Sequence, residues 1–370
     1  MKKKILFLIP TLKVGGAERM IQRIIFGLCQ TWDCSVVYLD QEQSVEKIDF
    51  PSNVTLIKLP VKKTRYAHFS VLKVIKNMRP DIVFSSWSRS NLLLLSIKWF
   101  LPKKTNIVIR EPNLPSFSLP VFQQRKIYEL LYKILYRKAN LIICQSKQMK
   151  LELITFFTVP ESKLHIIHNM LPIADIQAKA DEGNLEIDVY SSDVIACGRL
   201  EYQKGFDILI ESFVDVIKLN PSARLIIFGE GKERNNLETT IDKFGLQGSV
   251  LMPGSIKNPF KYMKRCGVYV SSSRWEGLPN AVLEAMACGA NIVASDCPGA
   301  TNEIIKHGKN GWLVSVNDTN GLSKGINNVF SGEWYLNTIS IRESAKQFDV
   351  DNILPKYTDL LNQAVKNNYL

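Results

Sequence analysis

The chain has 370 residues, a length greater than a single hydrophobic core usually serves, so two domains are expected. Hydrophobic residues make up 46% of the chain, which is enough to form both cores. Its seven cysteines are odd in number and include no C-x-x-C pair, which argues against a disulfide framework and against a zinc site. The net charge of +12 is unevenly distributed, because residues 1–170 carry +16 and residues 171–370 carry −4. A basic half is typical of proteins that bind nucleic acid, an anionic membrane or an anionic substrate.

The chain begins with three lysines and an apolar run at residues 5–9, before Pro10. A secretory signal needs an apolar core of roughly seven to fifteen residues, so this run predicts a buried strand instead. The apolar stretch at 92–101 contains Lys98 and is about half the length of a membrane span. We therefore expect no membrane-spanning segment and a cytoplasmic location.

Short apolar runs alternate with amphipathic stretches in the first half, such as the expected helices 17–30 and 121–138. This alternation predicts a parallel sheet covered on both faces. The expected strands are 5–9, 35–39, 54–58, 82–85, 107–110, 141–144 and 164–168.

A polar stretch without periodicity, residues 174–192, precedes a second alternating pattern. Its expected strands are 194–197, 224–228, 250–252, 268–270 and 291–294. The predicted fold class is therefore α/β, with two Rossmann-like doubly wound domains facing a cleft, and ligands are expected at the carboxyl ends of the strands. The predicted boundaries are 1–171 for the first domain, 172–350 for the second, and 351–370 for a final helix returning to the first.

The segment 275–289 reads WEGLPNAVLEAMACG and predicts a short helix from Pro279 to a capping Gly289. Glu284 lies mid-helix among apolar residues, and an unpaired buried carboxylate costs several kcal/mol. A ribose diol is one suitable partner because it donates two hydrogen bonds. The alternative is a glutamate on a narrow exposed stripe or paired with a lysine.

Other polar groups are expected at the same ends of the strands. Backbone N–H groups of Gly277 and Leu278, beside Glu276, precede the helix and are available to an anion. Arg199 and Lys204 follow the strand 194–197, where two cations suit a diphosphate leaving group. Surface cations in a loop are more often simply solvated.

Gly15 and Gly16 lie between the first strand and the first helix. Paired glycines let the backbone approach a phosphate or a sugar without an intervening side chain. The loop is not a G-x-G-x-x-G motif, so it is weak as a signal by itself.

Taken together, these motifs resemble the GT-B glycosyltransferases of family 4, over nearly the whole chain. The motifs are the loop GGAER at 15–19, GRL at 198–200 followed by KG at 204–205, FGEG at 228–231, and the two glutamates of 276–289. The resemblance implies a retaining glycosyltransferase in which Glu284 binds the nucleotide ribose and Glu276 contacts the donor sugar. It also implies that Arg199 and Lys204 hold the diphosphate, and that Glu303 is a further cleft residue.

The chain departs from this family at Arg110 and Glu111, where many members have a histidine. Both residues end a strand, so they either contact sugar or form a structural ion pair. His165 and His168 have no third ligand nearby in the sequence, and the D-x-D at 349–351 suits a helix cap. We therefore expect no metal and no cofactor beyond the substrate, a nucleotide diphosphate sugar that we expect to be UDP-linked.

The basic first half of the chain indicates what kind of molecule accepts the transferred sugar. Lys98, Lys103 and Lys104 adjoin Trp99 and Phe100. The segment 121–138 interleaves Phe122, Tyr128, Tyr132 and Tyr136 with Arg125, Lys126, Lys133, Arg137 and Lys138. This pattern suits a bilayer interface, although an ordinary solvated helix would look similar.

The function expected from the sequence is transfer of a hexose or N-acetylhexosamine to a polyprenyl-diphosphate-linked or other surface glycan. The protein would be peripheral on the inner face of the membrane and would bind its anionic surface. One alternative is a sugar-nucleotide epimerase of similar fold, which needs no acceptor surface. The other is a nucleic-acid-binding protein, but the chain has no zinc, helix-turn-helix or RNP signature, so no nucleic-acid partner is expected.

Overall fold

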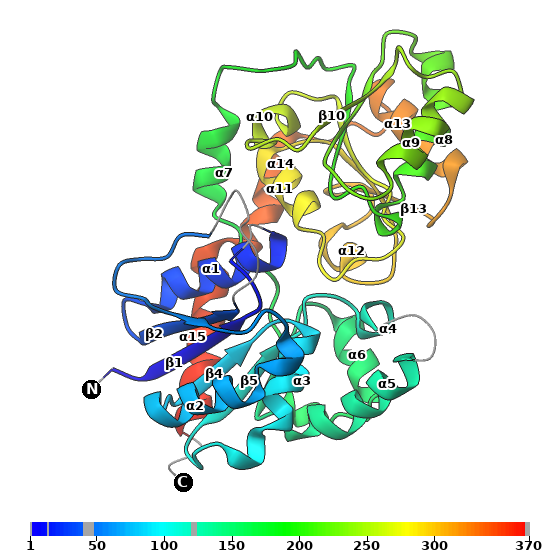
Figure 1. The fold of residues 1–370 in the computed structure, drawn as a ribbon. Coiled ribbons are helices and arrows are strands. Elements are labelled where there is room, and N and C mark those ends of the chain that lie inside the picture. Colours follow the sequence, from blue (N-terminus) through cyan, green and yellow to red (C-terminus); the bar gives the residue numbers. More distant parts are fainter. Residues whose placement is uncertain (1, 13–14, 40–47, 120–123, 367–370) are drawn as a thin grey trace. The chain divides into compact units, whose positions relative to one another are not determined.

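The computed structural model describes residues 2–12, 15–39, 48–119 and 124–366. They form two compact units, the first made of Met1–Met170 with Asp351–Leu370 and the second of Leu171–Val350 (Figure 1). Each unit contains a parallel sheet with helices on both faces. The predicted α/β class with two doubly wound sheets is therefore confirmed.

The sheet of the first unit has the strand order β3-β2-β1-β4-β5-β6-β7, and all of its pairings are parallel. The order changes direction between β1 and β4. The strands are β1 (Lys4–Ile9), β2 (Asp33–Leu39), β3 (Thr55–Leu59), β4 (Ile82–Ser85), β5 (Asn106–Arg110), β6 (Leu141–Cys144) and β7 (Leu164–Ile166).

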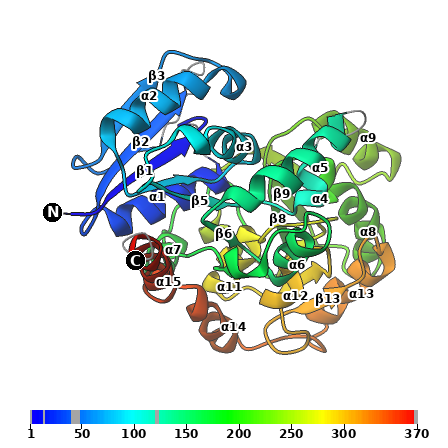
Figure 2. The same ribbon diagram turned by 90° about the horizontal axis from the view of Figure 1, so that it is seen from below.

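Helices cover both faces of this sheet because alternate strand residues point to opposite sides. Leu6 and Leu8 join a core with α2 (His68–Met78), α3 (Ser88–Ser96) and α5 (Gln124–Leu135). The last helix, α15 (Val350–Lys366), lies beside α1 (Gly16–Leu28), where the side chain of Leu354 packs against Gly27 (Figure 2). The remaining helical segments are η1 (Thr64–Tyr66), η2 (Lys98–Phe100), α4 (Pro115–Ser118), η3 (Tyr136–Lys138), α6 (Lys147–Thr155) and η4 (Glu161–Lys163).

The second unit repeats this plan with the parallel strand order β10-β9-β8-β11-β12-β13, which changes direction between β8 and β11. The strands are β8 (Val194–Cys197), β9 (Leu225–Phe228), β10 (Val250–Gly254), β11 (Val268–Ser271), β12 (Ile292–Ser295) and β13 (Trp312–Val314).

Two cores lie on the two faces of this second sheet. Ile195 and Ile226 point to one core, and their neighbours Val194 and Leu225 point to the other. The first face is covered by α7 (Ile173–Ala180), α10 (Phe260–Met263), α11 (Asn280–Cys288), α12 (Thr301–Ile304), α14 (Thr338–Ala345) and η6 (Lys346–Phe348). The other face is covered by α8 (Phe206–Leu219), α9 (Arg234–Lys243) and α13 (Thr319–Phe330), and η5 (Tyr202–Lys204) precedes α8.

The uneven charge of the sequence follows the two units. Residues 351–370 carry two lysines and two aspartates, so the first unit keeps its +16 and the second has −4. Within the described ranges, no helix combines the length and the apolar character needed to cross a bilayer.

Candidate active site

The carboxyl ends of β8 and β11 are neighbours in the second unit, at the point where the strand order changes direction. Open parallel sheets bind ligands at this place, in the crevice between the loops that follow the two strands. A pocket lies here between the loop after β8 and the loop after β11. Its lining includes Cys197, Lys204, Tyr269, Ser272, Ser273 and Glu276.

The two loops are held together at Lys204 and Ser272. The Ser272 hydroxyl donates to the carbonyl oxygen of Lys204 over 2.9 Å. The next residue, Gly205, has a φ of +61°, and a Cβ there would lie 2.2 Å from the carbonyl oxygen of Ser272. Glycine is therefore required at 205 for the loops to meet, and their contact fixes the backbone that carries Lys204.

Lys204 and Glu276 form an ion pair in the pocket. The Lys204 ammonium lies 2.6 Å from Oε1 of Glu276, and the Ser273 hydroxyl donates to the same oxygen over 2.7 Å. The two side chains are 20% and 8% exposed, respectively. An ammonium group has three donors, so Lys204 can hold Glu276 and still donate to a ligand. Both residues were expected at the site from the sequence, whereas their pairing and the contribution of Ser273 were not.

Arg199 lies in the same loop but in different surroundings. It is exposed, and its guanidinium has no hydrogen bond or ion pair with any residue that the structure describes. The loop beneath it is shaped by tight backbone contacts, because a Cβ at Gly229 would lie 1.8 Å from the carbonyl oxygen of Gly198. The glycines of the 228–231 motif therefore support this loop, and Arg199 is a cation available to a ligand.

The start of α11 also borders the site. The helix begins at Asn280, one residue later than expected, with Pro279 as its N-cap, and ends at Cys288, with Gly289 at a φ of +81° as its C-cap. Gly277 and Leu278 are buried just before it. Within the described ranges, the backbone N–H groups of Gly277 and Leu278 donate to no protein acceptor. Two such donors before a helix N-terminus suit an anion.

Glu284 lies on a half-buried strip of α11 with Asn280 and Ala281, and the helix is otherwise buried. The helix is therefore not enclosed on every side at Glu284. The strip borders the site, because Ala281 on it lines the pocket, and the charge of Glu284 adds to burial in raising the pKa values of the Cys197 thiol and the Tyr269 hydroxyl. Both of those residues line the pocket.

The segment after β12 adjoins Glu276. The backbone N–H of Glu276 donates to the carbonyl oxygen of Pro298 over 2.9 Å. Gly299 has a φ of +131°, and a Cβ there would lie 1.8 Å from the carbonyl oxygen of Glu276. Glu303 follows on α12 and is half-buried. Gly299 is a supporting residue that the sequence analysis missed.

Gly15 and Gly16 belong to the first unit, at the end of the loop after β1. Gly15 is the N-cap of α1, and a Cβ there would lie 2.4 Å from the carboxylate of Glu18. Glycine thus leaves room for Glu18 over the start of the helix. The preceding residues 13 and 14 lie outside the described ranges.

Glu111 is fully buried directly after β5. Its Oε1 accepts hydrogen bonds from the Tyr136 hydroxyl and, over 3.0 Å, from Asn91, whereas Oε2 has no partner in the described structure. Burial raises the pKa of this carboxyl to about 7, against the opposing effect of these hydrogen bonds. Arg110 donates elsewhere, to Ser86 over 2.9 Å and to Asn169, so the two residues do not form the ion pair considered above.

The remaining candidates from the sequence belong to the first unit, whereas the pocket belongs to the second. His165 is half-buried in β7, and burial lowers the pKa of its imidazole. Asp351 is exposed in the first turn of α15. The described residues bring no three His, Cys, Asp or Glu side chains together as a metal site.

Two family models match the chain, one for each unit. The model described as Glycosyltransferase Family 4 matches residues 14–174, and the model described as Glycosyl transferases group 1 matches residues 179–348.

Similar proteins cover most of the chain. An uncharacterized glycosyltransferase of Methanocaldococcus jannaschii is 32% identical over 278 residues, which are 72% of this chain and 67% of that protein. N-acetylgalactosamine-N,N'-diacetylbacillosaminyl-diphospho-undecaprenol 4-alpha-N-acetylgalactosaminyltransferase of Campylobacter jejuni is 28% identical over 367 residues, or 94% and 96% of the two chains.

Solved structures share the fold. Sucrose-phosphate synthase of Thermosynechococcus elongatus superposes with a TM-score of 0.79 at 18% identity, covering 98% of this chain and 99% of that one. Anabaena HepE in complex with UDP superposes with a TM-score of 0.75 at 20% identity, covering 97% and 100%.

Proposed function

The chain belongs to the GT-B glycosyltransferases of family 4, and we propose that it transfers a sugar from a UDP-sugar to a polyprenyl-diphosphate-linked glycan at the inner face of the membrane. The observation that carries the proposal is the group of anion-binding elements at one end of β8 and β11. Lys204 lines the pocket there, Arg199 lies exposed in the same loop, and the N–H groups of Gly277 and Leu278, which donate to no described acceptor, precede α11, at a place where sheets of this kind bind ligands.

These groups suit the leaving group of the reaction. The bond between the anomeric carbon and the diphosphate oxygen breaks, and negative charge grows on the diphosphate. Two cations and the helix N-terminus oppose that charge, which lowers the barrier by electrostatic stabilisation. Because the protein supplies positive charge itself, we propose that transfer proceeds without a divalent metal.

The donor is proposed to lie with its ribose at Glu284 and its sugar at Glu276. The half-buried position of Glu284, on the strip of α11 that borders the pocket at Ala281, supports the first contact, because a carboxylate accepts two hydrogen bonds from a diol. The ion pair with Lys204 supports the second, because it holds the Glu276 carboxylate in one place within the pocket.

We propose that the anomeric configuration is retained by attack on the same face. The acceptor oxygen forms its bond to the anomeric carbon as the phosphate oxygen leaves, and that phosphate oxygen takes the acceptor proton. A double displacement would need an enzyme nucleophile at the anomeric carbon. Glu276 has its Oε1 engaged by Lys204 and Ser273, which suits holding a sugar better than attacking it.

The acceptor and the sugar are proposed from similarity. Two Campylobacter jejuni relatives, 28% and 23% identical, are named as N-acetylgalactosaminyltransferases acting on diphospho-undecaprenol-linked glycans. An N-acetylhexosamine is therefore the first donor sugar to test. The epimerase alternative predicts conversion of the nucleotide sugar without an acceptor, and the nucleic-acid alternative predicts no conversion.

The test is to incubate the purified protein with UDP-sugars, with and without an undecaprenyl-diphosphate-linked glycan, and to measure UDP release and product stereochemistry. We expect release that depends on the acceptor, continues in excess EDTA and yields the retained anomer. Loss of activity in EDTA with recovery in manganese would remove the metal-free mechanism. Epimerised donor without acceptor would replace the proposal by the epimerase.

A further inference from the structure

The outward face of α5 carries a row of exposed aliphatic side chains. Ile127, Leu130 and Ile134 are 60%, 56% and 51% exposed, respectively. Their spacing of three and then four residues places them on one side of the helix. Large apolar side chains gathered on a surface indicate a place where the protein binds something apolar.

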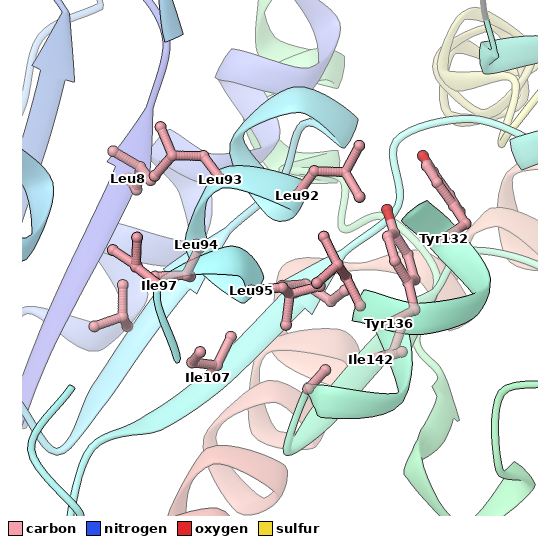
Figure 3. Close-up of a cluster of buried hydrophobic side chains, with 14 of the residues drawn as sticks. Leu8, Leu92, Leu93, Leu94, Leu95, Ile97, Ile107, Tyr132, Tyr136 and Ile142 are labelled. Atoms are coloured by element: carbon pink, nitrogen blue, oxygen red, sulfur yellow. The ribbon is translucent and has the colours of Figure 1, made fainter. Parts of the chain in front are cut away.

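The inward face of the same helix is fully used by the core. Tyr132 and Tyr136 are buried, stack with ring centroids 4.0 Å apart, and point towards the leucines of α3 (Figure 3). Of the aromatic residues expected at an interface in the segment 121–138, Tyr132 and Tyr136 therefore belong to the core, Tyr128 is half-buried, and Phe122 lies outside the described residues. The outward aliphatic residues are what remains available for binding.

Cations accompany the aliphatic row. Lys126, Lys133 and Arg137 are exposed, and their spacing of seven and then four residues puts them along the same side of the helix and its η3 extension. Neither Lys126 nor Lys133 pairs with a carboxylate in the described part of the chain. The face is thus amphipathic, with basic and aliphatic residues on adjacent rows.

Two exposed aromatic residues extend this face. Trp99 and Phe100, in η2, are 79% and 63% exposed. The ammonium of Lys138, at the end of η3, lies 5.6 Å from the centroid of the Trp99 ring, so η2 adjoins the end of α5 and η3. Exposed tryptophan is typical of a position at a membrane–water interface.

We propose that this face, formed by Trp99, Phe100, Lys126, Ile127, Leu130, Lys133, Ile134 and Arg137, docks on an anionic lipid bilayer. The inference rests on the proposed function, in which the acceptor is lipid-linked. The charge of the unit favours an anionic surface, since it carries the +16. The aliphatic row favours a bilayer over nucleic acid, because aliphatic side chains gain nothing from contact with a phosphate backbone. In a bilayer the aliphatic row can be buried among the acyl chains while the basic row contacts the anionic headgroups.

The test is co-sedimentation of the full-length protein with vesicles of phosphatidylcholine, either alone or mixed with about 30% phosphatidylglycerol. The ionic strength is kept near the physiological value, because salt screens the attraction between charges. We expect binding to the anionic vesicles and little to the neutral ones. Each cation near an anionic surface contributes roughly 1 kcal/mol, so Lys126→Gln with Lys133→Gln should weaken binding roughly 25-fold. Ile127→Ser with Ile134→Ser should weaken it on the order of tenfold or more.

Matched controls replace aliphatic residues by serine and lysines by glutamine at exposed sites of the second unit. Leu219→Ser with Ile339→Ser, and Lys243→Gln with Lys309→Gln, should bind vesicles like the wild type. Brominated lipid should quench tryptophan fluorescence in the wild type and less in Trp99→Phe. Circular dichroism of every variant establishes that it is folded.

The proposal is overturned if folded α5 variants bind as the wild type does, or if neutral and anionic vesicles bind equally. It is also overturned if Ile127→Ser with Ile134→Ser abolishes a dimer in sedimentation velocity while no vesicle binding occurs, because the face would then join two copies. UDP titration separates this result from the proposed function. A protein that binds vesicles but no UDP contradicts the function, and one that binds UDP but no vesicles contradicts the docking face.

Discussion

Arg199 and Lys204 follow the same strand, but they differ in what they already contact. Lys204 is paired with a nearly buried carboxylate, whereas Arg199 is exposed and unpartnered within the described structure. Removing Lys204 leaves the charge of Glu276 without its cation, which costs stability as well as any catalytic contribution. Removing Arg199 leaves no such defect.

We therefore expect Arg199→Ala and Lys204→Ala each to lower kcat far more than they raise the donor KM, because both cations oppose charge that grows in the transition state. Only Lys204→Ala should also lower the unfolding free energy, by about 1 to 3 kcal/mol. Glu276→Gln added to Lys204→Ala should restore stability without restoring turnover. Steady-state kinetics and thermal melts measure the two effects, and equal melting of both single variants would contradict the role of the ion pair.

Glu111 provides a second residue-scale prediction, through pH. Its pKa is raised from 4.5 to about 7, so the folded protein retains a proton there that the unfolded chain loses. Unfolding then becomes easier as the pH rises from about 4.5 to about 7, and this loss levels off above pH 7. Glu111→Gln keeps an acceptor for Tyr136 and cannot titrate. The free energy of unfolding of Glu111→Gln, relative to that of the wild type, should therefore increase by up to about 3 kcal/mol between pH 4.5 and pH 7.

Denaturant unfolding at several pH values measures this difference. Glu211, exposed on α8, is the matched control, and Glu211→Gln should give no comparable rise. A difference between Glu111→Gln and the wild type that does not change with pH would contradict the proton uptake.

At the scale of elements, the position of Glu276 depends on Gly299, which touches its backbone. Gly299→Ala puts a Cβ where the carbonyl oxygen of Glu276 lies, at a φ unfavourable for alanine. We expect a loss of about 2 kcal/mol or more in unfolding free energy and weaker UDP binding, because the loop after β11 must move. Gly248→Ala has nothing within 4 Å and should change neither. Thermal melts measure the change in stability, and calorimetric titration measures the affinity for UDP. An unchanged UDP affinity in Gly299→Ala would contradict the expectation that the contact between Gly299 and Glu276 shapes the nucleotide site.

Most elements could be predicted because fully buried parallel strands read as short apolar runs. The expected strand at 5–9 is observed as Lys4–Ile9, and the expected helix at 17–30 as Gly16–Leu28. β13, Trp312–Val314, was missed because three residues give no periodicity. The expectation that Tyr132, in α5, and Tyr136, in η3, lie at an interface was wrong, because both side chains are buried. Apolar residues occur on both sides of this helical segment, so the sequence does not show which side faces the core.

The site was predictable in part. Lys204, Glu276 and the start of α11 do meet at the ends of β8 and β11, because strand ends and glycine-rich loops are visible in the sequence. The pairing of Lys204 with Glu276 spans 72 residues, and its support by Ser273 and Gly299 depends on loop contacts. Such contacts arise only once the sheet is assembled, so residue types and spacing do not reveal them.

At the scale of the molecule, the chain does not divide into consecutive halves. The C-terminal helix α15 packs in the first unit, where Ile353, Tyr357 and Leu361 are buried. Asn106, the first residue of β5, also donates to the carbonyl oxygen of Ala364 over 3.0 Å, so the helix is joined to the start of that strand. The second unit, by contrast, is a continuous segment whose own helices cover both faces of its sheet.

We therefore expect residues 171–350 to fold alone and residues 1–170 to be unstable without α15, because only the latter would expose a core face of its sheet. All the groups proposed to hold the nucleotide diphosphate, except Gly15 and Gly16, lie in the second unit. The isolated segment should therefore bind UDP within about tenfold of the full chain, and Glu284→Ala should weaken binding in both, since the ribose hydroxyls would lose an ionised acceptor. Circular dichroism and calorimetric titration measure the two properties. A folded segment that fails to bind UDP, beside a full chain that does, would mean that the first unit supplies an essential part of the nucleotide site, and the loop at Gly15 would be the first place to look for it.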